Sequence, residues 1–121
     1  SRIMLAIEVV LSKGEQASTF IFDEVDAGVG GAAAIEVGKR LKQLSQTSQV
    51  IVVTHLAQVA AFANHHLKVN KTVSDEFTVS DVSSLSVDQR VAELARMLSG
   101  LSDSEAAQTH ARELLALGAS A

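Results

Sequence analysis

Phe20-Ile21-Phe22-Asp23-Glu24 is the stretch that decides the fold, because a short apolar run ends there in two adjacent carboxylates. The run predicts a strand that is buried on both faces, as in a parallel sheet. Asp23 and Glu24 then stand at its C-terminal end, where open α/β sheets bind their ligands. Side chains alternate along a strand, so the two carboxylates point in different directions. That geometry suits two tasks, such as holding a metal ion and orienting a water molecule, although a strand can also simply end in polar residues.

A second β-branched run, from Val50 to Val53, ends in Thr54 and His55. Residues 32–44 between the two runs have the apolar spacing of a helix, so the three segments predict parallel strands joined by a helical crossover. The C-terminal ends of parallel strands meet at one edge of a sheet, and we therefore expect Asp23, Glu24 and His55 to share a crevice. A single histidine after a strand is more often structural, but its place beside paired acids favours a functional role.

The remaining segments predict a helical and hairpin periphery around this unit. Two helices close the chain, with capping-box spacing at Ser86/Gln89 and at Ser102/Glu105 and glycine stops at Gly100 and Gly118. The other expected elements are a buried helix over 3–11 that ends at Gly14, a short helix over 56–63, and strands over 67–71 and 76–80, the first of which is also compatible with an extension of the main sheet. We expect one α/β domain over residues 1–121.

Composition limits the classes of protein to which the chain can belong. Hydrophobic residues make up 47% of the 121 positions, which predicts a folded core rather than disorder. The net charge of −4 argues against wrapping nucleic acid by bulk attraction. The sequence has no cysteine, so disulfides and thiolate metal sites are excluded. No apolar run reaches the length of a membrane span, and a cytoplasmic protein is expected.

Two further motifs weigh little, and the absence of a third matters. The stretch from Gly28 to Ala33 matches the dinucleotide fingerprint, but Asp23 to Ala27 separate it from the strand and no acid ends the second strand. We expect these glycines to form a tight turn that another backbone approaches closely. His65 and His66 have no acids at ligand spacing, so we expect a loop or strand edge rather than a metal site. A phosphate loop of the form G-x-x-x-x-G-K-[ST] is absent from the chain.

Taken together, these motifs resemble the RecN family of bacterial DNA repair ATPases, which are relatives of the SMC proteins with ABC-type ATPase heads. The stretch from Phe20 to Glu24 resembles a Walker B motif, with Thr19 as a mild departure, and 25–28 resembles a D-loop. His55 resembles the switch histidine, and Ser1-Arg2 looks like the tail of the signature motif. The segments 25–31, 54–61 (with Ala57 where a proline is common), 90–100 and 110–115 are similar to the narrower family, so the resemblance covers nearly the whole chain.

The resemblance implies the fold and the roles of individual residues. The fold would be the C-terminal lobe of an ATPase head, with the phosphate loop and a coiled coil elsewhere in the parent protein. Asp23 would hold the Mg²⁺ of bound ATP through water, Glu24 would activate the attacking water, and His55 would contact the γ-phosphate. Asp26 would lie at the interface between two heads, and Ser1 and Arg2 would belong to the segment that closes over the ATP of the partner head.

The same resemblance implies the biological setting. The full-length protein would be an ATPase acting in recombinational repair of DNA double-strand breaks in the bacterial cytoplasm, in association with the nucleoid. Its partners would be the N-terminal half of the same protein, a second head in a homodimer, and DNA, with no membrane contact. We expect this chain alone to be inactive, because it lacks a phosphate loop.

Three alternatives remain open from the residues themselves. The first is another SMC-like or ABC-type ATPase head. The second is a non-catalytic receiver or scaffold domain in which the acids merely bind Mg²⁺ and Lys68 or Lys71 supplies a cation, which leaves Thr54-His55 unexplained. The third is a nucleotide-dependent oxidoreductase, weakened by the displaced glycines. A phosphate loop and a long heptad region upstream would separate the ATPase heads from the others.

Overall fold

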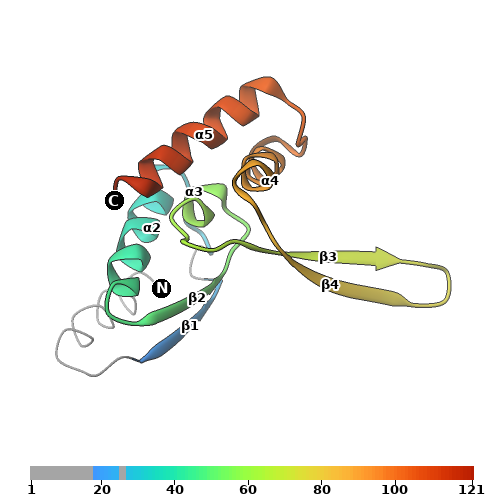
Figure 1. Ribbon diagram of the computed structural model, residues 1–121, viewed down its shortest axis with the longest axis horizontal. Coiled ribbons are helices and arrows are strands. Elements are labelled where there is room, and N and C mark those ends of the chain that lie inside the picture. The colour runs from blue at the N-terminus through green and yellow to red at the C-terminus, as the bar shows by residue number, and fades with distance from the viewer. Residues whose placement is uncertain (1–17, 25–26) are drawn as a thin grey trace.

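The structure is a computed structural model that describes residues 18–24 and 27–121 (Figure 1). It has a parallel strand pair, an antiparallel hairpin and flanking helices, which confirms the predicted α/β class. The helix predicted over 3–11, with Gly14 at its end, lies outside the described residues. The elements in chain order are β1 (Thr19–Asp23), α2 (Ala32–Ser45), β2 (Gln49–Val53), α3 (Ala57–Ala60), β3 (Leu67–Val73), β4 (Thr78–Ser84), α4 (Val87–Ser99) and α5 (Glu105–Ala119).

The parallel pair is buried on one face only, which corrects the expectation of a strand buried on both faces. Strands β1 and β2 pair in register from Thr19 opposite Gln49 to Asp23 opposite Val53, and α2 packs on one side of them. Phe22 is buried against that helix, whereas Ile21 on the other face is 72% exposed. An apolar run does not reveal whether one or both faces are covered, because the cover comes from other parts of the chain.

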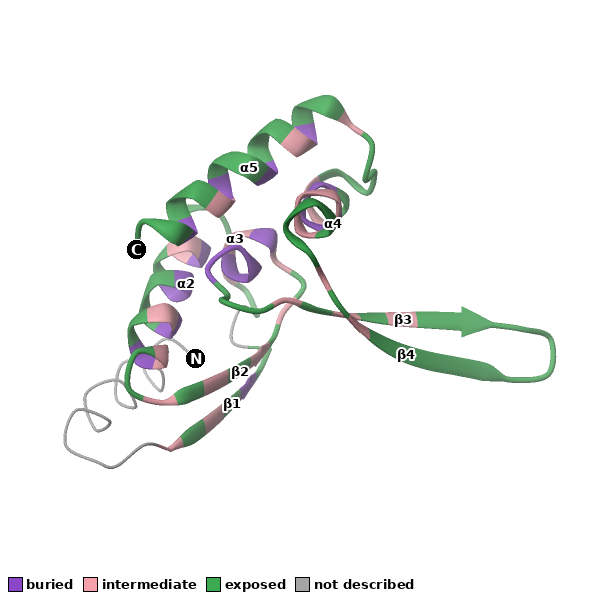
Figure 2. Cartoon of the chain, in the orientation of Figure 1, coloured by how far each residue is buried: buried purple, intermediate pink, exposed green. Residues whose placement is uncertain are grey.

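A second core joins α3 to the two C-terminal helices and consists largely of alanine. Small side chains let helix backbones approach closely. The four-residue α3, whose buried residues are mostly alanine, is accordingly packed among longer helices (Figure 2). The predicted stripes on the two terminal helices contribute Leu94 and Leu114, both buried. The buried members of this core are Ala57, Ala60, Ala61, Leu94, Ala95, Ala107, Ala111 and Leu114.

The β3–β4 hairpin extends away from both cores and is mostly exposed (Figure 2). It is a separate antiparallel sheet, so the first of its strands does not extend the parallel pair. The second strand begins at Thr78 rather than at Glu76, because the polar turn takes up the intervening residues. None of the helices in the described part of the chain has the length and apolar character that a bilayer-spanning segment needs.

Helix α4 begins with the predicted capping box. The Gln89 backbone N–H donates to Ser86 Oγ at 3.3 Å, and the Ser86 N–H donates to Gln89 Oε1 at 2.9 Å. The helix stops at Gly100, whose φ of 79° is left-handed and therefore favours glycine. Both ends of α4 were thus predicted from local sequence signals.

Substitution of Ser86 by alanine is expected to lower the free energy of unfolding by about 1 kcal/mol, because it removes one half of this capping box. Ser86→Asp is the matched control, since its carboxylate also accepts from the helix N–H groups and favours the positive end of the helix dipole. Urea unfolding of the three proteins measures the difference. An alanine variant as stable as the native chain would contradict the proposed importance of the cap.

Helix α5 departs from the prediction at both ends. Its N-cap is Ser104, whose Oγ accepts from the Ala107 N–H at 3.4 Å, rather than Ser102. Its C-cap is Ser120, so Gly118 lies within the helix and does not end it. Gly118 is buried against α3, and a Cβ added there would lie 2.2 Å from the Ala61 carbonyl oxygen. The glycine therefore permits close packing instead of a helix stop.

Candidate functional site

The two acids and the histidine singled out from the sequence stand at one edge of the parallel pair. Asp23 is the last residue of β1 and lies opposite Val53, the last residue of β2. Glu24 follows the first strand directly, and His55 comes two residues after the second. All three side chains are exposed to solvent at this edge. We refer to Asp23, Glu24 and His55 together as the acid edge.

The backbone at Glu24 is strained. Its φ is 56°, which makes it the only non-glycine residue with a positive φ among residues 18–24 and 27–121. The left-handed region costs an ordinary L residue roughly 1–2 kcal/mol. The Ala27 N–H donates to the Glu24 carbonyl at 3.1 Å. Strain of this kind tends to occur where a side chain must be aimed at a particular place.

The glycine turn connects the acid edge to α2. Gly28 and Gly31 have φ values of 71° and 56°, which confirms the predicted tight turn. The predicted close approach of another backbone is not found, because no described atom lies within 4 Å of a Cβ added at either glycine or at Gly30. Gly31 instead serves as the N-cap of α2, and its carbonyl accepts from the Ala34 N–H at 3.1 Å.

His55 sits in a short turn between β2 and α3. The Leu56 N–H donates to Thr54 Oγ1 at 3.0 Å, so the threonine hydroxyl closes the turn around the histidine. Helix α3 is shorter than predicted, over Ala57–Ala60, and its apolar residues are buried. The histidine is therefore exposed on a turn whose following residues are fixed in the core.

Three of the residues named from the resemblance cannot be placed. Ser1, Arg2 and Asp26 lie outside the described residues. The described part of the chain contains no group of three or more His, Asp or Glu side chains that could hold a metal ion. A magnesium ion bound with a nucleotide needs only one or two carboxylates, because phosphate oxygens and water complete its shell. Asp23 at the strand end fits that requirement.

A buried charge cluster at the base of the hairpin was not predicted. Glu93 on α4 is 6% exposed, and Lys68 Nζ on β3 lies 2.7 Å from its carboxylate. Arg96 Nε donates to the same carboxylate at 3.0 Å. Burial alone raises the pKa of the Glu93 carboxyl, but the hydrogen bonds from Arg96 and Lys68 outweigh it and lower the pKa. The cluster fastens the hairpin to α4.

His66 adjoins the same cluster. Burial and, to a lesser degree, the positive charge of Arg90 lower the pKa of its imidazole, which favours the neutral form. Its Nδ1 atom is buried and lacks a hydrogen-bond partner among the described residues. The only signal that the sequence offered for the cluster is Glu93 beside the apolar stripe of α4, three residues before Arg96.

Comparison with known proteins identifies close sequence relatives. The chain is 60% identical over 116 residues to the DNA repair protein RecN of Deinococcus radiodurans, covering 96% of this chain and 20% of the relative. It is 56% identical over 115 residues to that of Streptomyces coelicolor, covering 95% and 20%. To that of Treponema pallidum it is 44% identical over 119 residues, covering 98% and 21%. The chain thus spans about a fifth of the length of the curated relatives it matches.

A solved structure has a similar fold over part of this chain. It comes from work on ATP-driven dimerization and DNA-stimulated activation of SMC ATPases, and it matches with a TM-score of 0.55 and 30% sequence identity. The match covers 71% of this chain and 51% of that chain. No family model matches the sequence.

Proposed function

We propose that this chain, which belongs to the family of RecN DNA repair proteins and spans about a fifth of their length, carries the hydrolytic edge of an SMC-like ATPase head. The parent protein would act in recombinational repair of DNA double-strand breaks. One observation supports this most strongly. Asp23 and Glu24 at the end of β1 and His55 just after β2 lie at the same edge of the parallel pair, although 31 positions separate Glu24 from His55.

The chemistry of ATP hydrolysis matches the groups at the acid edge. Phosphoryl transfer needs positioning and charge neutralisation more than covalent chemistry. Asp23 would hold Mg²⁺ through water, and the ion would neutralise the charge of the phosphates. Glu24, whose strained backbone has a φ of 56°, would orient and deprotonate the attacking water. His55 would contact the γ-phosphate from the neighbouring strand.

The remaining contributions would come from other parts of the parent protein. A phosphate loop is absent from this sequence, so we propose that the N-terminal half of the same protein supplies it. A second head would complete the ATP site in a homodimer, with Asp26, Ser1 and Arg2 near that interface. DNA would be bound by the full-length protein rather than by this acidic segment, in the cytoplasm at the nucleoid.

Of the alternatives, a different SMC or ABC head is less well supported than RecN, because relatives that are 56% and 60% identical over nearly the whole chain are RecN proteins. The receiver-type alternative would use a lysine from a later strand beside the acids. Lys68 instead pairs with Glu93 at 2.7 Å, at the base of the hairpin. This pairing engages one of the two candidate lysines, and the other, Lys71, lies farther along the exposed hairpin strand β3.

Substitution of Asp23 by asparagine tests the magnesium role. Asparagine keeps the size of the side chain but removes its charge, so we expect the Mg²⁺ concentration for half-maximal ATP turnover by the full-length protein to rise at least about tenfold. The measurement is a magnesium titration of phosphate release at fixed ATP. Asp81→Asn, an exposed aspartate on β4, is the matched control and should leave the titration unchanged. An unaltered magnesium requirement in Asp23→Asn would argue against the proposal.

A further inference from the structure

Helix α3 connects the acid edge to the helical core, and it begins two residues after His55. Four residues are too few for a helix to persist by itself, because nucleation costs more than so few hydrogen bonds return. Its N-cap, Leu56, provides no side-chain cap. The position of α3, and with it the turn that carries His55, therefore depends on contacts from elsewhere in the chain.

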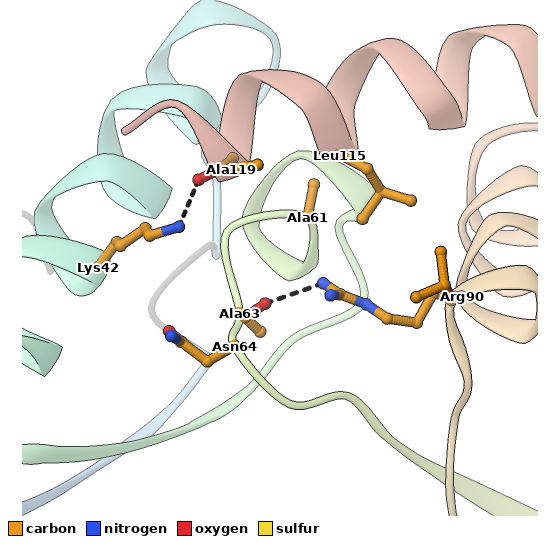
Figure 3. Close-up of a pocket in the computed structure, with 9 residues that line it drawn as sticks. Lys42, Ala61, Ala63, Asn64, Arg90, Leu115 and Ala119 are labelled. Atoms are coloured by element: carbon orange, nitrogen blue, oxygen red, sulfur yellow. Dashed lines mark hydrogen bonds between the residues drawn. The ribbon is translucent and has the colours of Figure 1, made fainter.

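The C-terminal end of α3 is held by an arginine from α4. Arg90 Nη2 donates to the Ala63 carbonyl at 3.0 Å and to the Ala60 carbonyl at 3.3 Å (Figure 3). A cation at the carbonyl end of a helix satisfies unpaired acceptors and complements the helix dipole. Arg90 is half-buried, and its Nε has no partner among the described residues, so its donors are concentrated on this one segment.

Two glycines confine the same segment from the sides. A Cβ added at Gly118 of α5 would lie 2.2 Å from the Ala61 carbonyl oxygen, and one added at Gly38 of α2 would lie 2.4 Å from the ring of Phe62. The Ala61–Phe62 backbone therefore lies against α5 and the Phe62 ring lies against α2, which leaves the segment little space to shift sideways. Movement along α3 is opposed at its C-terminal end by the hydrogen bonds from Arg90.

A competing use of Arg90 is as part of an anion site, because it and Lys42 both line the hollow between α3 and α5 (Figure 3). Both cations are already engaged by carbonyl groups near helix ends: Lys42 Nζ donates to the Gly118 carbonyl as Arg90 does to Ala60 and Ala63. Their charge is thus complemented within the fold. The contacts favour a structural connection over a ligand site.

We propose that Arg90 is a positioning residue for His55: by fixing the carbonyl end of α3 it holds the histidine turn at the acid edge in the orientation that hydrolysis requires. The proposal rests on the proposed function for its catalytic consequence, but not for its structural one. It also gives a role to the segment from Arg90 to Gly100, which the sequence singled out and the acid edge does not use.

Hydrogen exchange tests the structural part. In the full-length protein, Arg90→Met should raise amide exchange over residues 56–63 at least about tenfold while exchange in α2 is unchanged. Arg96→Met is the matched control on the same helix, since its guanidinium pairs with Glu93 and does not touch α3. Unchanged exchange over 56–63 in Arg90→Met, or the same increase in both variants, would overturn the proposal.

Kinetics test the catalytic part. We expect Arg90→Met to lower kcat for ATP about tenfold with the Kd for ATP unchanged, and Arg90→Lys, which keeps the charge and a donor, to recover part of the loss. If Glu24→Gln has lost turnover but Arg90→Met keeps the native kcat despite faster exchange over 56–63, the positioning role is refuted. Retention of turnover by Glu24→Gln would instead refute the proposed function, and the exchange result would still decide whether Arg90 holds α3.

Discussion

Replacement of Glu24 by glutamine is expected to lower ATP turnover by the full-length protein by about 10²- to 10⁴-fold, the range for loss of a general base. Glutamine has nearly the same shape, so the strand end and Asp23 should keep their positions. It cannot take a proton from the attacking water, and its amide nitrogen is a donor where an acceptor is needed. Steady-state phosphate release measures the loss, and the affinity for ATP, measured separately, should stay within a few-fold of the native value.

The matched control is Glu76→Gln, which makes the same chemical change in the exposed turn of the hairpin. It should leave turnover unaltered. The 121-residue chain supplies a second comparison, because it lacks a phosphate loop and should hydrolyse ATP only when the rest of its parent chain is added. Hydrolysis at the native rate by Glu24→Gln would show that this carboxylate is not the base.

The backbone of Glu24 adds a physical reason to expect a large effect. A positive φ favours glycine or asparagine, so a glutamate at φ 56° reduces stability for no gain in packing, since its side chain is exposed. Such strain is understandable if the carboxylate itself is required there. The conformation was not predictable from the sequence, in which Asp23-Glu24 shows only that two acids follow a strand.

The elements with strong local signals were predicted well. The run from Val50 to Val53 and the capping box at Ser86 specify their own conformation, because β-branched residues favour strands and the box satisfies helix N–H groups locally. Parallel pairing also predicted that the two strands end side by side, and Asp23 lies opposite Val53 at their ends. The acid edge was therefore accessible from the sequence as a set of positions, though not as a set of orientations.

Features that depend on distant parts of the chain were missed. Ile21 was wrongly expected to be buried, because an apolar run looks alike whether one or both faces of its strand are covered. Here one face is open to solvent. Buried Glu93 was missed because its partner Lys68 is 25 positions away on another element. The contact between Arg90 and the end of α3 was missed for the same reason, since an arginine on a helix usually faces solvent.

Gly118 shows how the same residue type can serve two purposes. Glycine near the end of a helical pattern usually marks a stop, and that interpretation was wrong here because the helix continues to Ala119. The other use of glycine, close approach of two backbones, has no local signature. Both uses make substitution by alanine destabilising, whereas a glycine in an exposed helix interior would be replaced with a gain in stability.

Gly118→Ala is expected to lower the free energy of unfolding by about 1–3 kcal/mol, the usual range for adding a methyl group to a packed interior. In an exposed helix interior the same change would be stabilising by about 1 kcal/mol, because alanine has the higher helix propensity. Here the new Cβ would lie 2.2 Å from the carbonyl oxygen of Ala61 and 2.9 Å from its carbon, both backbone atoms. The clash can be relieved only by moving α5 away from α3.

Gly38→Ala provides the informative contrast, because its new Cβ would meet the ring of Phe62 rather than backbone. A side chain can rotate or be shortened, so Phe62→Leu should recover part of the stability lost in Gly38→Ala and none of that lost in Gly118→Ala. Urea unfolding of the three single variants and the two doubles measures these couplings, with Ala116→Ser on the exposed face of α5 as the control for enlargement. A Gly118→Ala protein more stable than the native one would mean that α5 does not pack against the end of α3.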